Sequence, residues 1–306
     1  MARSAQAVAA AETQGITAVG SRPRSTLPLK LPSIVLLLLW SIVPLAMTLW
    51  FSFQRYNLLQ PTERGFAGLD NYVFLFTDQG LITALVNTLW LVGWVLFITV
   101  ALGTLFAVLF DQDFFGRGVA RVLVIAPFFV MPTVSALIWK NMLMHPVNGL
   151  FAWIMNSVGL TPIDWFADYP LLAIMIMVTW QWLPFATLIL LTAIQALDPE
   201  RKEAARMDGA GPISMFFFII VPHLGRAISA VVMIETLFLL GVFAEIYVTT
   251  TGGPGFASTN LAFLIYRYAL REWDVGGASA GGVLAIVLAN IVAVVLMRSV
   301  AKNIEA

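Results

Sequence analysis

Residues 82–110 read ITALVNTLWLVGWVLFITVALGTLFAVLF, and no charged residue interrupts this stretch. A helix needs about 20 mostly apolar residues to cross the roughly 30 Å of hydrocarbon in a lipid bilayer. The stretch is long enough, so it predicts a membrane-spanning helix. The whole chain agrees, because 60% of its 306 residues are hydrophobic and 11% are charged. Soluble domains carry about 25% charged residues, so the composition excludes a soluble globular enzyme and an intrinsically disordered chain.

Five more segments meet the same length, which predicts an all-α integral membrane protein with six transmembrane helices. The predicted spans are Leu31–Phe53, Ile82–Phe110, Val122–Met142, Leu171–Ala196, Ile228–Tyr247 and Gly277–Met297. Residues 1–28 are rich in Ala, Ser and Thr, so we expect a flexible tail before one transmembrane domain over residues 29–306. A cleaved signal peptide is the alternative for the first apolar run. That run is long for a signal core and lacks a small-x-small exit, which favours an uncleaved span.

Positive charges choose the orientation, because Lys and Arg in short loops are retained on the cytoplasmic side. With the N-terminus inside, five of the 17 Lys and Arg residues lie outside, namely Arg55, Arg64, Lys140, Arg267 and Arg271. The other twelve lie inside, so we expect both termini in the cytoplasm. Two outer segments, Gly149–Val158 and Asn260–Arg271, have the amphipathic pattern of short helices along the membrane surface.

Charge and cysteine content exclude several partners. Seventeen basic and 17 acidic residues cancel, so no surplus of positive charge attracts a nucleic acid. Cysteine is absent, which excludes disulfides and thiolate metal sites. His145 and His223 are predicted on opposite sides of the membrane, so they cannot share a metal ion and we expect no metal site.

The inner loop between spans four and five, residues 196–222, is too polar to lie in lipid and too long for a simple connection. Asp198 followed by Pro199 is typical of a helix start, and Gly209 is typical of a helix end. We therefore predict a short helix over Pro199–Asp208. Its charged residues surround Ala204 and Ala205, where small side chains would let another backbone approach closely. A solvated surface helix without a partner has the same charge pattern.

Glu203-Ala204-Ala205, then three residues, Gly209, nine residues, Ile219, one residue and Val221-Pro222 resembles the EAA signature of bacterial binding-protein-dependent ABC importer permeases. That family usually has Leu where Val221 stands. The maltose-type, carbohydrate branch of the family is similar at further positions, which are residues 66–72 (FAGLDNY), residues 208–210 (DGA) and residues 251–254 (TGGP).

The resemblance implies the type I permease fold of ABC importers in the bacterial inner membrane. It implies a permease half that pairs with a second, homologous permease, two cytoplasmic ATPase subunits and a periplasmic solute-binding protein. The Pro199–Asp208 helix would be the coupling helix, with Glu203, Ala204, Ala205, Asp208 and Gly209 at the ATPase. The partner subunits would bind ATP and Mg²⁺, so we expect no cofactor and no catalytic residue in this chain. Its sequence indeed lacks a GxxxxGK[ST] phosphate loop.

Glu235 lies inside predicted span five, where a carboxylate costs about 2.5 to 3.5 kcal/mol on insertion scales. Two interpretations remain open. The carboxylate could be protonated or paired against a neighbouring helix, or it could bind a hydroxylated solute. Ionisable residues inside spans are usually functional, so we expect the second. The resemblance adds that the solute cavity of the maltose-type family lies at mid-membrane, where span five contributes polar residues.

Span four contains Trp180-Gln181-Trp182-Leu183-Pro184-Phe185, in which Pro184 is expected to kink the helix. Sugars pack their flat C–H faces on aromatic rings and hydrogen-bond through their hydroxyl groups. The candidate solute-binding residues are therefore Glu235, Gln181, Trp182, Phe185, and, in the proline-broken span three, Phe128 and Thr133. Plain packing is the alternative for the aromatic residues. Asn87 and Asn290 are as compatible with links between helices as with solute binding.

These observations predict a permease subunit that moves a sugar or sugar alcohol by alternating access and catalyses no covalent chemistry. The alternatives are a permease for another solute, such as glycerol phosphate or a polyamine, and a proton-coupled transporter with Glu235 as the carrier. Glycerol phosphate would require a cationic cavity, but no Lys or Arg lies deep in a predicted span. An intramembrane enzyme lacks a plausible nucleophile, base and metal set within the spans.

Overall fold

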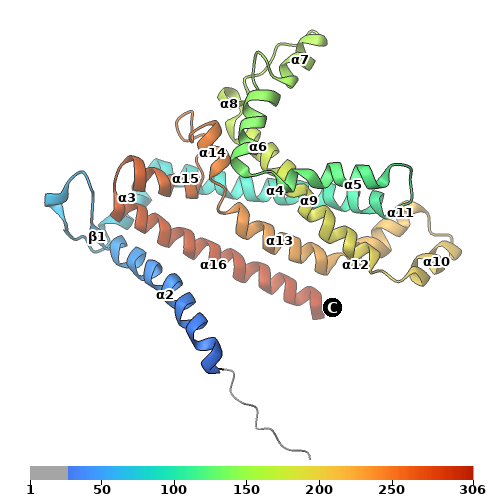
Figure 1. Cartoon of the computed structure of the whole chain (residues 1–306), viewed down its shortest axis with the longest axis horizontal. Coiled ribbons are helices and arrows are strands. Elements are labelled where there is room, and N and C mark those ends of the chain that lie inside the picture. Colours follow the sequence, from blue (N-terminus) through green and yellow to red (C-terminus); the bar gives the residue numbers. More distant parts are fainter. Residues whose placement is uncertain (1–26, 306) are drawn as a thin grey trace, which may run out of the picture. The chain divides into compact units, whose positions relative to one another are not determined.

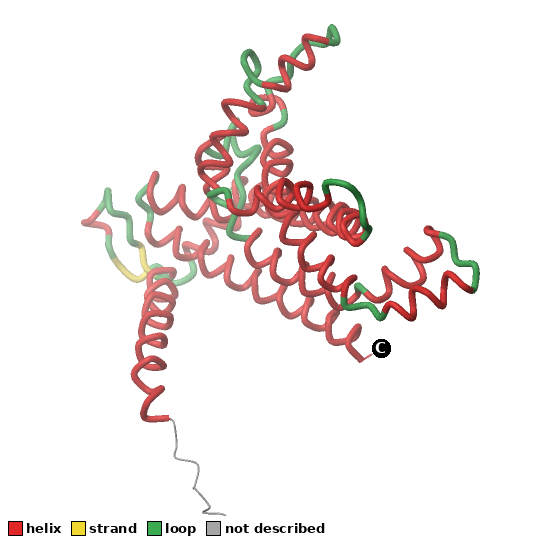
Figure 2. The backbone as a smooth tube through the Cα atoms, turned by 45° about the vertical axis from the view of Figure 1, so that its right-hand side comes forward, coloured by secondary structure: helices red, strands yellow, loops and turns green. Residues whose placement is uncertain are grey.

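The computed structural model describes residues 27–305, and nearly all of them are helical or lie in short connections (Figures 1 and 2). The predicted tail over residues 1–28 therefore lies almost wholly outside the described residues. Helix α2 (Leu27–Ser52) matches the first predicted span, and none of its residues from Lys30 to Phe51 is buried. The described residues up to Met47 form one compact unit, and those from Thr48 onward form the other.

Three long helices of the second unit match predicted spans two, four and six. They are α4 (Gln79–Asp111), α9 (Pro170–Gln195) and α16 (Val275–Glu305). Helices α4 and α9 pack along each other, and Gly103 of α4 allows their close approach. A Cβ atom at Gly103 would lie 2.9 Å from the Cβ of Ala186, closer than side chains tolerate. Leu91, Val95, Ile174 and Val178 are fully buried in this part of the core.

Predicted span three is broken at its prolines. Helices α5 (Arg117–Ile125) and η2 (Ala126–Phe129) come before the break, and α6 (Pro132–Ile138) and η3 (Trp139–Leu143) follow it. The two halves are bent by 109°. Proline disfavours the helical conformation in the residue before it and has no N–H to donate, so Pro132 begins a new helix instead of continuing the old one.

Predicted span five, Ile228–Tyr247, is wrong at both ends, because the bent apolar segment of membrane length runs from Pro212, inside the predicted polar loop 196–222, to Leu239. Helix α13 (Gly225–Leu239) stops early, and α14 (Ala244–Thr249) begins after a break. The break is held from elsewhere in the chain, because the side-chain amide of Asn260 donates to the carbonyl of Val242 within it at 2.5 Å. Before α13 lie α11 (Pro212–Met215), η4 (Phe216–Ile220) and α12 (Val221–His223), and this segment is bent from α13 by 61°.

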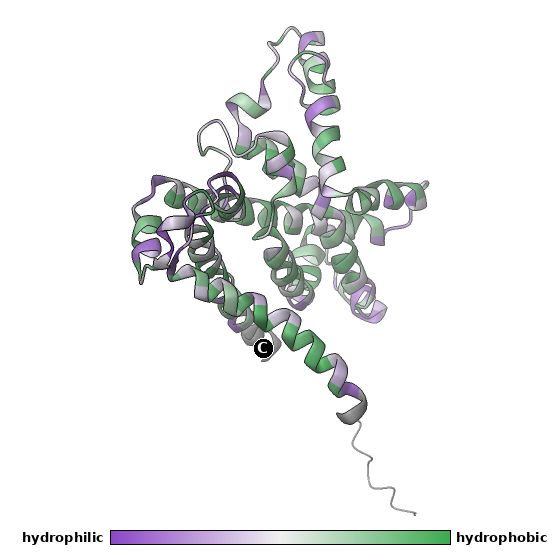
Figure 3. Cartoon of the chain, turned by 60° about the vertical axis from the view of Figure 1, so that its left-hand side comes forward, coloured by the Kyte–Doolittle hydropathy of each residue, from purple (hydrophilic) through white to green (hydrophobic). Residues whose placement is uncertain are grey.

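By length and composition, four described helices are able to cross a membrane, and six spans result if each bent pair counts as one. Hydrophobic residues cover most of the surface of the long helices, and hydrophilic residues gather at their ends and in the connections (Figure 3). Trp90 and Phe97 of α4, for example, are 62% and 71% exposed. Such surfaces require an apolar surrounding, which a bilayer provides.

The connections contain short elements. These are β1 (Gln54–Arg55) paired antiparallel with β2 (Gly65–Phe66), η1 (Pro61–Glu63), α3 (Asp70–Thr77), α7 (Leu150–Ser157), α8 (Trp165–Asp168), α10 (Pro199–Met207), α15 (Leu261–Tyr266) and η5 (Arg267–Arg271). The two predicted outer helices are confirmed as helices, since α7 matches Gly149–Val158 and α15 with η5 matches Asn260–Arg271.

Candidate functional site

Four aromatic side chains from three elements meet in one cluster, named here the aromatic cluster. Its members are Phe128 of η2, Trp182 and Phe185 of α9, and Phe238 of α13. The ring centroids of Trp182 and Phe238 lie 5.1 Å apart, and those of Phe128 lie 5.8 Å from Trp182 and 5.9 Å from Phe185. Phe128 is 37% exposed and Phe238 is 61% exposed, so the cluster has an open face in this chain.

Three of these four residues were predicted from the sequence, and Phe238 was missed. A signal for it existed, because Phe238 follows Glu235 by three positions on a helix and such residues are neighbours on its surface. Thr133, the other candidate from predicted span three, is exposed at the start of α6.

Gln181 precedes Trp182 in the sequence and forms a hydrogen bond to the backbone at the break in span three. Its Nε2 donates to the carbonyl of Val130, in the break between η2 and α6, at 2.8 Å. Its Oε1 is buried and has no hydrogen-bond partner within residues 27–305. A buried acceptor without a donor is costly, so this oxygen is available to a hydroxyl group that reaches it.

Glu235 is completely buried between α13 and α4. The hydroxyl of Thr99 donates to its Oε2 at 2.7 Å, while its Oε1 finds no hydrogen-bond partner in the described part of the chain. The carboxylate therefore links two helices in this conformation and does not lie on the open face of the aromatic cluster. It would reach a solute only if α4 and α13 separated.

A second buried carboxylate, Glu245 at the start of α14, was not considered among the candidates. It is 5% exposed, and α14 packs against α6. Its position inside predicted span five would have identified it by the criterion that identified Glu235. Nearby, the ammonium group of Lys140 donates to the carbonyls of Val248 and Thr249 at 3.0 and 2.9 Å. Lys140 thus caps the C-terminal end of α14.

Asn87 and Asn290 are both hydrogen-bonded to backbone. The buried amide of Asn87 donates to the carbonyls of Phe256 and Thr259 at 3.0 and 2.9 Å, and so holds the loop that contains the Thr251-Gly252-Gly253-Pro254 turn against α4. Asn290 is exposed and donates to the carbonyl of Ile286 in its own helix at 2.8 Å. Of the two interpretations that the sequence left open for Asn87, the structure supports a link between segments.

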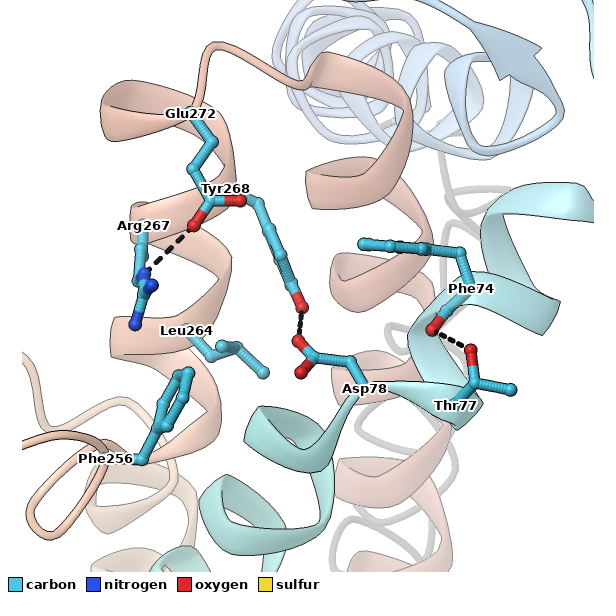
Figure 4. Close-up of a pocket in the computed structure, with 8 residues that line it drawn as sticks. All are labelled: Phe74, Thr77, Asp78, Phe256, Leu264, Arg267, Tyr268 and Glu272. Atoms are coloured by element: carbon cyan, nitrogen blue, oxygen red, sulfur yellow. Dashed lines mark hydrogen bonds and ion pairs between the residues drawn. The ribbon is translucent and has the colours of Figure 1, made fainter.

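A cavity of about 200 Å³ lies near the N-terminus of α4 (Figure 4). The hydroxyl of Tyr268 points to Asp78 and donates to it, and the Nε of Arg267 donates to Glu272 at 2.9 Å. Burial, and then the Asp78 carboxylate, raise the pKa of the Tyr268 hydroxyl above its ordinary value. The charged groups around this cavity are therefore already paired with one another.

Helix α10 confirms the predicted helix in the inner loop. The Asp198 carboxylate accepts from the backbone N–H of Glu200 at 3.0 Å, and Pro199 is the first helical residue. At the other end Gly209 has φ of +82°, and the N–H of Ala210 donates to the carbonyl of Ala205, which forms a glycine-terminated helix end. No residue of α10 is buried, and Glu203, Ala204, Asp208 and Gly209 are exposed.

The chain is similar to one known protein family and to individual transport proteins. A family described as "Binding-protein-dependent transport system inner membrane component" matches residues 80–306. The chain is similar to the trehalose/maltose transport system permease protein MalF of Thermococcus litoralis, with 32% identity over 270 residues, 88% of this chain and 90% of that one. It is also similar to the sn-glycerol-3-phosphate transport system permease protein UgpA of Salmonella typhimurium, with 27% identity over 279 residues, 90% and 93% of the two chains.

Two solved structures share the fold. One is a bacterial ABC transporter involved in the import of the acidic polysaccharide alginate, with a TM-score of 0.78, 22% identity and coverage of 90% of this chain and 94% of that one. The other is a bacterial alginate ABC transporter in complex with an alginate pentasaccharide-bound periplasmic protein, with a TM-score of 0.72, 23% identity and coverage of 90% and 91%.

Proposed function

The chain belongs to the family of binding-protein-dependent transport system inner membrane components, and from this premise we propose that it translocates a sugar or sugar alcohol by alternating access. The family consists of transport permeases, not enzymes, and places this multi-pass protein in the bacterial inner membrane. The six helical spans with both termini in the cytoplasm are part of the proposal.

The observation that carries the proposed solute class is the aromatic cluster with its open face. Phe128, Trp182, Phe185 and Phe238 offer rings on which the C–H face of a sugar packs. Hydroxyl groups of the solute would donate to the free oxygens of Gln181 and Glu235, which lack donors within the described residues. Thr133 is exposed near the break in span three and completes the proposed set.

Alternating access explains how a buried Glu235 would take part. Its carboxylate is closed off between α4 and α13 in this conformation, and a solute would compete with the Thr99 hydroxyl when the helices separate. A solute shifts such an equilibrium only by binding one conformation more tightly than the other. A hydroxylated guest that supplies two donors to Glu235 in place of one has that property.

Glycerol phosphate is the second candidate solute, because UgpA is a glycerol-3-phosphate permease and is similar over most of both chains. A phosphate requires cationic partners in the cavity. Lys140, near the outer end of predicted span three, is occupied by two carbonyls of α14, and the buried side chain next to the aromatic cluster on α13 is acidic. A polyamine would suit Glu235, and cations also pack on aromatic faces, so the aromatic cluster does not decide against it. The similarity to the trehalose/maltose permease MalF favours a neutral polyhydroxylated solute.

In the proposed assembly this permease lies in the lipid bilayer with three other kinds of subunit. A second permease covers the open face of the aromatic cluster, two ATPase subunits bind ATP and Mg²⁺, and a periplasmic binding protein delivers the solute. Exposed α10 supports the docking of an ATPase, with Glu203, Ala204, Ala205, Asp208 and Gly209 at the contact. A proton-coupled transporter would have no use for such a helix.

Transport by the reconstituted complex in proteoliposomes tests the proposal. We expect uptake of one or more sugars or sugar alcohols that requires ATP and the binding protein, is stopped by vanadate, and is insensitive to a protonophore. Uptake of glycerol phosphate in preference to every neutral polyol would overturn the solute class. Vanadate-insensitive uptake that a protonophore abolishes would establish the secondary-transporter alternative.

A further inference from the structure

Helix α10 is tied to the transmembrane helices by a single recorded ion pair among the described residues. The Nζ of Lys202, in α10, lies 2.8 Å from the Oδ2 of Asp111, the last residue of α4. The two side chains are 19% and 27% exposed, so the pair is partly buried. Solvent and salt screen such a pair less than they screen an exposed one.

Apart from its covalent connections to α9 and α11, α10 has little contact with α4. No residue of α10 is buried, and a cavity of about 670 Å³ is lined by α10, the end of α4 and η4. Asp111 and Lys202 face this cavity together with Arg206, Met215 and Phe216. Because apolar packing does not fill the space, the ion pair is the direct side-chain contact through which a displacement of α10 would reach α4, beside the covalent connections of α10 to α9 and α11.

Asp111 is a poor choice for the end of a helix unless it has a cationic partner. The C-terminal end of a helix carries a partial negative charge, and a carboxylate there is destabilising. The nearby ion pair between Asp113 and Arg117 shows the contrast, because it joins the short connection after α4 to the first residue of α5, and Asp113 has a 93% exposed side chain. The Asp111–Lys202 pair instead joins residues 91 positions apart.

Helix α4 reaches from this ion pair to the solute region and to the far loop. It is one helix without an internal proline, and Asn87 and Asp111 are separated along it by about 36 Å at 1.5 Å per residue. Between them, Thr99 binds Glu235 of α13. At the other end, Asn87 binds the loop at residues 256–259, and the hydroxyl of Thr88 accepts from the N–H of Leu261 at 2.9 Å.

We propose that the Asp111–Lys202 ion pair is the tie through which α10 moves α4, and that α4 then moves the loop held by Asn87 and the helix held through Glu235. The inference rests on the proposed function, because it assigns positioning residues to the coupling of this permease to its ATPase. Asp111 and Lys202 act by holding two helices together, and neither residue contacts the solute.

Charge exchange tests the tie. Asp111→Asn and Lys202→Gln should each lower ATP-driven uptake by about fivefold or more, since coupling free energies between sites usually correspond to at least that factor. ATPase co-purification and basal ATP hydrolysis should stay at the wild-type level. The exchanged pair Asp111→Lys with Lys202→Asp should restore uptake to within about twofold, because the attraction is recovered with its direction reversed. Asp113→Asn is the matched control and should leave uptake unchanged.

A spectroscopic measurement distinguishes a loss of coupled movement between α10 and the far loop from a loss of protein stability. This chain has no cysteine, so a spin label attached to Ala257→Cys before the complex is assembled reports on the loop held by Asn87. ATP with vanadate should change the spectrum in the wild-type complex and in the exchanged pair, but not in Asp111→Asn.

Two results would overturn the tie. One is normal uptake in both single variants, and the other is failure of the exchanged pair to recover uptake and label response in an assembled complex. Failure of the proposed function would look different, since the wild-type complex would then show no vanadate-sensitive uptake of any sugar or polyol.

Discussion

At the scale of single residues, Glu235 combines a structural contact with an unused acceptor. Thr99 satisfies Oε2, and Oε1 has no partner among the described residues. Burying an acceptor without a donor is unfavourable, and the chain tolerates it at a position where a hydroxylated guest would provide the donor. This argument makes Glu235 testable separately from its contact with Thr99.

We predict that Glu235→Leu abolishes uptake while assembly and basal ATP hydrolysis remain largely intact. Glu235→Gln keeps shape and hydrogen bonding and should be intermediate, with an altered preference among sugars and polyols. Hydrogen bonds to charged groups contribute about 1.5 to 3 kcal/mol, so apparent affinity should fall about tenfold or more in the Leu variant. Uptake across a solute panel in proteoliposomes measures both effects.

The matched control is Thr99→Val, which removes the contact between α4 and α13 but retains the carboxylate. It should leave the order of preference among solutes unchanged. If Thr99→Val and Glu235→Leu reduce uptake equally and neither alters that order, Glu235 is a structural residue.

Asn87 is a second residue whose role is local and measurable. Asn87→Ala would leave the carbonyls of Phe256 and Thr259 without their buried donor, which costs about 1 to 3 kcal/mol. The apparent unfolding temperature in detergent should fall by several degrees. Asn290→Ala removes only an exposed bond within its own helix and should change stability by less than about 0.5 kcal/mol. Equal unfolding temperatures for the two variants would contradict the assignment.

At the scale of elements, the end of α10 depends on the left-handed conformation of Gly209. A β-branched residue is strongly disfavoured at φ of +82°, whereas Asn tolerates positive φ better than most residues. We predict that Gly209→Val displaces the exit of α10, so that uptake is lost and less ATPase co-purifies. Gly209→Asn should retain most of both activities.

The charged border of α10 gives a companion prediction. Glu203 is exposed and has no recorded partner among the described residues, so its replacement leaves the fold of this chain intact. Glu203→Lys should weaken ATPase co-purification through the changed charge at the docking surface. Wild-type co-purification and uptake in both Glu203→Lys and Gly209→Val would exclude α10 as the coupling helix.

At the scale of the whole molecule, the orientation predicted from Lys and Arg can be measured at exposed positions. Ala257 lies in the predicted outer loop and is exposed, while Met207 of α10 is 88% exposed on the predicted inner side. A membrane-impermeant thiol reagent should label Ala257→Cys in intact spheroplasts, and Met207→Cys only after permeabilisation. Ser258 is unsuitable for this purpose, because it is fully buried. The reverse pattern of labelling would overturn the predicted orientation.

Local sequence determined the membrane character of the chain and the places where most of its helices lie. An uninterrupted apolar stretch over residues 82–110 forms a helix in lipid because no water is present to satisfy its backbone groups. Asp198, Pro199 and Gly209 set the ends of α10 through contacts within a few residues, so its bounds were predicted almost correctly. Pro132 likewise indicated the break in span three.

Only the tertiary structure decided the contacts that connect distant segments. Asn260 holds the break between α13 and α14 by binding the carbonyl of Val242, and Phe238 joins the aromatic cluster because α13 packs against α9. Thr99 meets Glu235 across 136 residues of sequence, and Asp111 meets Lys202 across 91. Hydropathy and helix caps act over one or two turns and carry no information on which faces of two helices will meet. Packing in three dimensions makes that choice, and it gave both carboxylates their partners.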